Sequence, residues 1–166
     1  METSMGLQAI LVGIGATFIM DVWGWLQKNI FNSPPLNYAL IARWLAFMPK
    51  GQLVHRPIMA TPSIRGEKPL GWVLHYLIGI VFALTHVFIW GEAWLAEPSV
   101  IPAIFTGIVT LVFPFCIIQP CLGFGVAASQ TPRPWKARWL SFLAHSAYGI
   151  GLFGSALSLH ICSVIL

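Results

Sequence analysis

The chain has 166 residues, of which 57% are hydrophobic and only 8% are charged, and its mean hydropathy is +0.79. Soluble domains carry about 25% charged residues, and one small domain has too little interior to hide so much apolar surface. The composition therefore argues against a water-soluble protein and indicates one integral membrane domain, residues 1–166. The net charge of +4 would suggest nucleic acid for a soluble chain. Here the basic residues lie in loops between apolar segments, so we expect a lipid bilayer and no nucleic acid as partner.

Four segments are apolar over a length that can cross about 30 Å of hydrocarbon, which takes about 20 helical residues. They cover residues 5–26, 70–90, 100–119 and 139–164. The sequence before the first segment lacks the basic region of a secretory signal, so we interpret that segment as a retained span. Pro114 lies within the third span and favours a kink there. The predicted fold is an all-α bundle of four transmembrane helices.

The loop 32–69 between the first two spans holds one further apolar run, residues 36–48. Ser33 and the two prolines after it are typical of a helix start, and Pro49 and Gly51 end the run. The run is too short to cross a bilayer. We therefore predict a short interfacial or half-buried helix in this loop.

The basic residues predict the orientation, because all nine of them lie in two loops or at their edges. The first group is Lys28, Arg43, Lys50, Arg56, Arg65 and Lys68, and the second is Arg133, Lys136 and Arg138. In the connection between the second and third spans, the only charged residues are acidic. The positive-inside rule then places both basic loops in the cytoplasm. The expected location is a bacterial inner membrane, crossed several times, with both termini in the periplasm.

The second and fourth spans share the pattern H-x-x-x-G-I, at 75–80 and 145–150. The two hairpins run through the membrane in the same sense, so the pattern suggests a tandem duplication of a two-helix unit.

Four polar residues lie within the spans near the predicted cytoplasmic side: Asp21, His75, Gln119 and His145. Asp21 and the two histidines come to similar depths, about 8–11 Å below the surface at the rise of an α-helix. Small residues at every fourth position share their helix faces, which turns these side chains into the bundle. An unpaired carboxylate in hydrocarbon is costly, so we expect Asp21 to hydrogen-bond His75 or His145. The group is either a structural brace or a functional site, such as a proton relay or an acid–base pair.

Metal binding is a weaker interpretation of the same region. Cys116 and Cys121 lie on the third span, but their spacing is not a recognised ligand pattern and buried cysteine commonly behaves as a small hydrophobe. We expect no metal, no cofactor and, with three cysteines in all, no disulfide framework. His86 and His160 lie toward the periplasmic side and are candidates to extend a proton path.

The basic loops offer candidate contacts for an anionic lipid head group or another phosphate: Arg43, Arg65, Lys68, Arg133 and Arg138. The alternative is that these residues serve only as the topology signal.

Four segments carry a resemblance to a known family: GIGATFIMD at 13–21, NYALIARW at 37–44, the RGE and LGWVLHY motifs within 65–76, and QPCLGFGVAASQTP at 119–132. With them the chain resembles a family of small bacterial inner-membrane proteins known only as a domain of unknown function. The resemblance implies four spans and transfers no activity and no site residues.

Three functions remain open. The first is that the chain handles a small solute, a proton or a lipid in a pocket near the cytoplasmic leaflet. The second is a membrane-embedded enzyme that acts on lipid, and the third is a structural or assembly subunit. Transport by only four spans would require a homo-oligomer. No catalytic residue is indicated.

Overall fold

The structure, a computed structural model, describes residues 4–165, and over that range it contains helices and no strand. Four helical segments are long and apolar enough to cross a membrane. They are α1 (Met5–Phe31), α3 (Glu67–Trp90), the segment Val100–Cys121, and α7 (Pro134–Ile165). The predicted all-α fold with four membrane spans is confirmed.

All four spans are longer than their apolar runs predicted, and α1 and α7 are extended the most. α1 ends at Phe31, not near residue 26, because Gln27 and Asn29 satisfy their side chains locally, on the carbonyls of Ser33 and Trp25. Asn32, in the left-handed conformation with φ 46°, then ends the helix. α7 begins at Pro134, since proline is well accommodated in a first helical turn.

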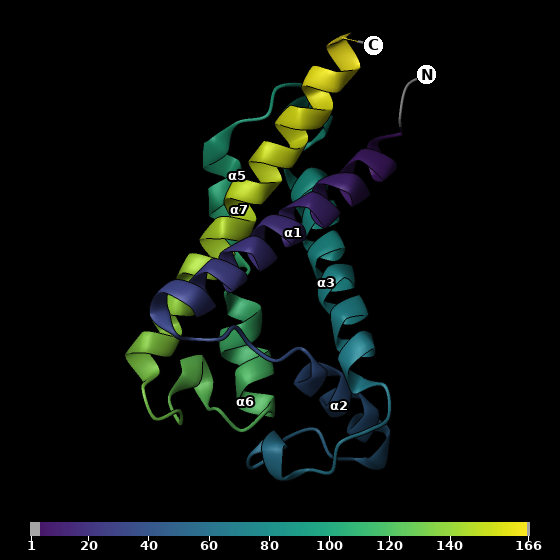
Figure 1. Ribbon diagram of the computed structural model, residues 1–166. Coiled ribbons are helices and arrows are strands. Elements are labelled where there is room, and N and C mark those ends of the chain that lie inside the picture. The colour runs from purple at the N-terminus through teal and green to yellow at the C-terminus, as the bar shows by residue number, and fades with distance from the viewer. Residues whose placement is uncertain (1–3, 166) are drawn as a thin grey trace.

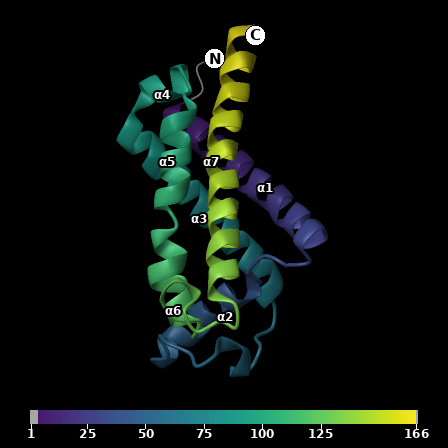
Figure 2. The same cartoon turned by 90° about the vertical axis from the view of Figure 1, so that its left-hand side faces the viewer.

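The four spans are arranged as an open arc. α1 packs against both α3 and α7, and α7 packs against α5 (Val100–Val109), so that α3 and α5 form the two ends of the arc. Figure 1 shows α1 crossing α7, with α3 leaning away from α6 (Gln119–Cys121) toward the end that carries α2. Figure 2 shows both termini at the opposite end, near α4 (Glu92–Ala96). The arc leaves a concave side between α3 and the third span.

Glycines allow the closest helix contacts within each hairpin. A Cβ on Gly13 of α1 would lie 2.8 Å from the Cα of Ile80 in α3, and a Cβ on Gly149 of α7 would lie 2.9 Å from the Cα of Ile104 in α5. Small residues at such crossings are the usual means of helix association in membranes. Gly79 and Gly149, which are equivalent in the shared H-x-x-x-G-I pattern, thus both lie at contacts with the other helix of their own hairpin. The tandem duplication itself stays a prediction.

The third span is interrupted, as Pro114 predicted. The α-helix ends at Val109, and the segment η3 (Pro114–Ile118) is π-helical before α6 completes the span. Pro114 has no N–H to offer the carbonyl of Thr110, and that carbonyl instead accepts from the N–H of Phe113 at 3.1 Å. The interruption places the Thr110 side chain at a break in the helix.

The loop helix α2 (Ala39–Phe47) is present and packs on the bundle through buried residues such as Leu40 and Ile41. Its predicted start at Ser33 is wrong. The Ser33 hydroxyl bonds the carbonyl of Phe31, and the helix begins later because the Asn37 side chain accepts the N–H of Ala39 at 3.1 Å. The predicted half-buried position is confirmed.

Short turns then join the two hairpins at the α2 end. After η1 (Met48–Lys50), the segment around η2 (Ile58–Ala60) reaches the end of α6, where the N–H groups of His55 and Ile58 donate to the carbonyls of Cys121 and Leu122. The turn η4 (Val126–Ala128) leads on to α7. These bonds tie the loop of the first hairpin to the end of the third span.

Candidate functional site

A cavity of about 1050 Å³ occupies the concave side of the arc. Val81 and Ile89 of α3 and Phe105 and Phe113 of the third span line it, each of these side chains is about half exposed or more, and α3 and α5 contact each other only weakly. The cavity is therefore open sideways between α3 and the third span, where the wall is apolar. In a bilayer such an opening faces lipid.

Asp21 and His75 form the hydrogen bond expected from their equal depth. His75 Nε2 lies 3.0 Å from Asp21 Oδ1, with side chains 10% and 15% exposed. The Tyr38 ring stacks on the imidazole at 3.8 Å between centroids and 14° between planes, and its hydroxyl donates to the same carboxylate oxygen at 3.5 Å. Burial, and then the neighbouring carboxylate, raises the pKa of Tyr38, so this hydroxyl stays protonated. The group ties α1, α3 and the start of α2 together.

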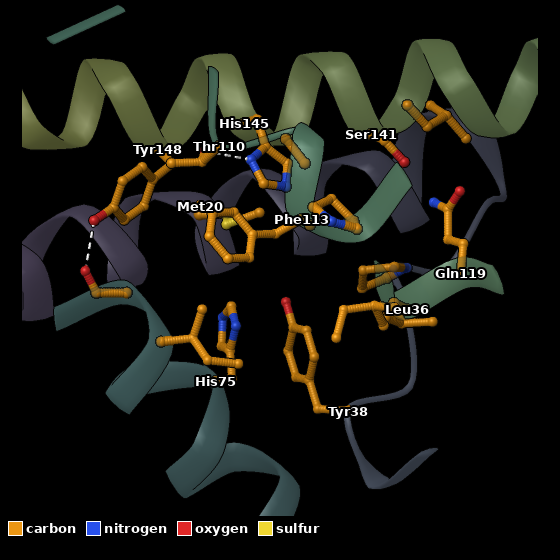
Figure 3. Close-up of a pocket in the computed structure, with 18 of the residues that line it drawn as sticks. Met20, Leu36, Tyr38, His75, Thr110, Phe113, Gln119, Ser141, His145 and Tyr148 are labelled. Carbon is orange, nitrogen blue, oxygen red and sulfur yellow. Dashed lines mark hydrogen bonds between the residues drawn. The ribbon is translucent and has the colours of Figure 1, made fainter. Parts of the chain in front are cut away.

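His145 is held by a different partner. Its Nδ1 lies 2.8 Å from Thr110 Oγ1, and that hydroxyl donates to the carbonyl of Gly107 at 2.6 Å. A hydroxyl has one hydrogen, so Nδ1–H must be the donor to Thr110. The neutral imidazole then keeps the lone pair on Nε2. Figure 3 shows His145 and Thr110 in the cavity, across from Tyr38 and His75.

The predicted polar group is thus divided between two walls. His75 lines the cavity from α3, whereas Gln119 and His145 line it from the opposite side. Figure 3 places Gln119 and Ser141 together at one end of that wall. Asp21 is not part of the wall and lies against His75. The Oε1 atom of Gln119 is buried and has no hydrogen-bond partner among residues 4–165. That these residues act as a functional site stays a prediction.

The basic residues have different roles in the structure. Arg133 and Lys136 line the cavity where α7 begins. Arg43 instead donates to the Glu67 carboxylate through Nη2 and Nε, at 2.7 and 2.9 Å. These bonds raise the pKa of Arg43. Its Nη1 donates to the carbonyl of Thr61 at 3.0 Å. Arg138 donates to the carbonyl of Ala127 at 2.8 Å.

Arg65 and Lys68, the other two candidate head-group contacts, do not line the cavity. Of the five basic residues considered from the sequence, Arg133 alone belongs to its wall.

His86 lies farther along the same cavity, toward the end with the termini. It is fully buried, its Nδ1 lies 2.7 Å from Thr106 Oγ1, and its ring and that of Trp94 make a T-shaped contact with 4.2 Å between centroids. Thr106 and Thr110 are one helical turn apart, so neighbouring threonines hold two imidazoles. His160 is half-buried and does not line the cavity. A proton path through either histidine stays a prediction.

Sequence reasoning missed several residues of this site: Tyr38, Thr106, Thr110, Lys136 and Tyr148. Polar side chains inside an apolar span indicate a candidate site, and Thr106 and Thr110, four residues apart on the third span, could have been found in this way. Tyr148, whose hydroxyl donates to the carbonyl of Gly79 at 2.6 Å, gave no such signal.

No group of three or more histidine, cysteine, aspartate or glutamate side chains within the described part of the chain could hold a metal ion. Cys116 and Cys162 are exposed on the outer face, and Cys121 is partly buried. The chemistry that the cavity offers is hydrogen bonding within an apolar wall, with positive charge at one end.

The sequence matches a family described as "Protein of unknown function (DUF2938)" over residues 10–159. The chain therefore belongs to this family, in agreement with the resemblance in its motifs. No curated protein and no solved structure matches the chain.

Proposed function

We propose that this chain is a multi-pass protein of the bacterial inner membrane that takes an anionic lipid from the bilayer into the cavity. The observation that carries the proposal is the form of that cavity. It is open toward lipid between α3 and the third span, and it has two basic residues, Arg133 and Lys136, at one end.

The size and lining of the cavity support a lipid as ligand. Ligand sites commonly enclose about 300–1,000 Å³ and have mostly apolar walls with a few polar groups, and this cavity, at about 1050 Å³, is slightly larger. Arginine and lysine at a membrane surface attract anionic head groups. The head group then lies at the start of α7, and the acyl chains extend toward the apolar opening.

The charge distribution supports the orientation. With both basic loops in the cytoplasm, the start of α7 lies at the cytoplasmic leaflet and both termini lie in the periplasm. Alkaline phosphatase fused to the C-terminus should then be active, and green fluorescent protein fused there should be dark. A fluorescent fusion at the C-terminus would overturn the orientation.

Lipid binding is tested with the purified full chain in nanodiscs that contain a mixture of phosphatidylglycerol and phosphatidylcholine. The bound lipids are counted by native mass spectrometry after ejection from the nanodisc, and the same spectra report whether the chain is a homo-oligomer, as transport by four spans would require.

A matched pair of variants separates the cavity from the general surface. Each basic residue near a membrane surface contributes about 1 kcal/mol toward anionic lipid. Arg133→Gln with Lys136→Gln should therefore reduce phosphatidylglycerol retention by more than tenfold. The control, Arg65→Gln with Lys68→Gln, removes the same charge outside the cavity and should leave retention unchanged. An equal loss in both variants, or no lipid retained by the unmodified chain, would contradict the proposal.

A further inference from the structure

We infer that the cavity contains a second polar subsite, at His145, that accepts a hydrogen bond from a hydroxyl group on the apolar part of the ligand. This inference rests on the proposed function and names its ligand class: an anionic lipid that carries a hydroxyl within its hydrocarbon region.

The hydrogens at His145 decide what the subsite can bind. The one hydrogen of Thr110 goes to the carbonyl of Gly107, and the Nδ1–H of His145 goes to Thr110. The neutral imidazole therefore presents Nε2 as an acceptor only. Since His145 lines the cavity, this lone pair needs a donor that the ligand can supply.

Gln119 does not belong to this subsite, although its side chain lines the same wall. Its Oε1 is buried away from open space, and it has no hydrogen-bond partner within residues 4–165. The Nε2 lone pair of His145 favours a hydroxyl and disfavours an anion, which would bring further lone pairs and no hydrogen. The phosphate or carboxylate of the ligand belongs at Arg133 and Lys136 instead.

The spacing along α7 separates the two subsites. His145 follows Lys136 by nine residues, which is about 13 Å of helix rise. A lipid whose charged group meets Lys136 must therefore carry its hydroxyl several carbon atoms away along the acyl chain. A hydroxyl next to the charged group would not reach His145.

The spacing is tested with three fatty acids: stearate, a stearate hydroxylated in mid-chain, and a stearate hydroxylated next to the carboxylate. Their affinities for the purified full chain in detergent micelles are compared by isothermal titration calorimetry. We expect the mid-chain hydroxyl to improve affinity by about fivefold to tenfold, as the net gain from one hydrogen bond allows. The hydroxyl beside the carboxylate should bring no gain.

Variants assign the preference to His145. His145→Phe keeps the ring shape and leaves the hydrogen of Thr110 on Gly107, so it should fold and lose the mid-chain preference. Thr110→Val serves as a second variant, because it removes the acceptor that keeps the hydrogen on Nδ1, and it should weaken the same preference. The matched control is Thr85→Val. Thr85 also lines the cavity, but its hydroxyl donates to the carbonyl of Val81 at 2.8 Å, so the preference should persist.

The outcomes distinguish the two levels of the argument. Equal affinity for stearate and its mid-chain hydroxylated form overturns the subsite and leaves lipid binding intact. A preference that survives in both the His145 and Thr110 variants overturns the assignment to His145. Failure to bind any of the three fatty acids overturns the proposed function itself.

Discussion

The hydrogen bond between Asp21 and His75 offers a graded test of how the first hairpin is held at the level of the cavity. Asp21→Asn keeps an oxygen at the position of Oδ1, which lies 3.0 Å from His75 Nε2, and removes only the negative charge. Asp21→Leu removes the acceptor altogether and leaves His75, 10% exposed, without its partner. The stability of the folded bundle should fall in that order.

The magnitudes follow from the kind of bond. Hydrogen bonds to a charged group contribute about 1.5–3 kcal/mol, roughly twice the contribution of neutral ones. Between membrane helices measured values average about 0.6 kcal/mol and reach about 1.7. For a charge-assisted bond we expect Asp21→Asn to cost about 1 kcal/mol and Asp21→Leu about 2–4 kcal/mol, since the Leu variant also leaves buried polar groups unpaired.

The assay is equilibrium unfolding in bicelles by steric trapping, with a double-mutant cycle that adds His75→Phe to each Asp21 variant. The coupling between Asp21 and His75 should be about 1.5 kcal/mol, which is the lower end for a charge-assisted bond and close to the largest values measured between membrane helices. A coupling below about 0.5 kcal/mol would refute the view that the pair braces α1 on α3. Equal losses for Asn and Leu would show that the negative charge, not the acceptor geometry, stabilises the bundle.

Two further substitutions test the packing that surrounds the cavity. Gly149→Ala should destabilise the α5–α7 contact by about 1–3 kcal/mol, because the new Cβ would lie 2.9 Å from the Cα of Ile104. The control is Gly154→Ala in the same helix, where a new Cβ meets nothing within 4 Å. Its free energy of unfolding in the same assay should stay within about 0.5 kcal/mol of that of the unmodified chain. Arg43→Lys keeps the charge but loses the bidentate contact with Glu67 and the bond to the carbonyl of Thr61. Protease cleavage in the loop 51–66 should therefore accelerate. The control is Lys50→Gln, at an exposed residue next to this loop, and it should leave the cleavage rate unchanged. Equal effects from either pair of substitutions would contradict the reasoning.

The sequence alone determined the fold class, because the bilayer accepts few solutions. A backbone in hydrocarbon must satisfy its own hydrogen bonds, so four long apolar runs already imply four helices. The interruption at Pro114 followed in the same way from the missing N–H of proline. A hydrogen bond from Asp21 to one of two histidines, His75 or His145, could be expected as well, since equal depth and the cost of an unpaired carboxylate left few partners.

Only the tertiary structure decided which polar residues share a site. The sequence placed Asp21, His75 and His145 at one depth, but it contained no information on which helices pack together. Because α1 lies between α3 and α7, Asp21 reaches His75, and His145 turns to Thr110 on the neighbouring third span.

The cavity depends on the same packing. It exists because α3 and α5 close the arc only weakly. The hydropathy of each helix is the same whether its neighbour is lipid or another helix, so no single span carries the signal for that opening.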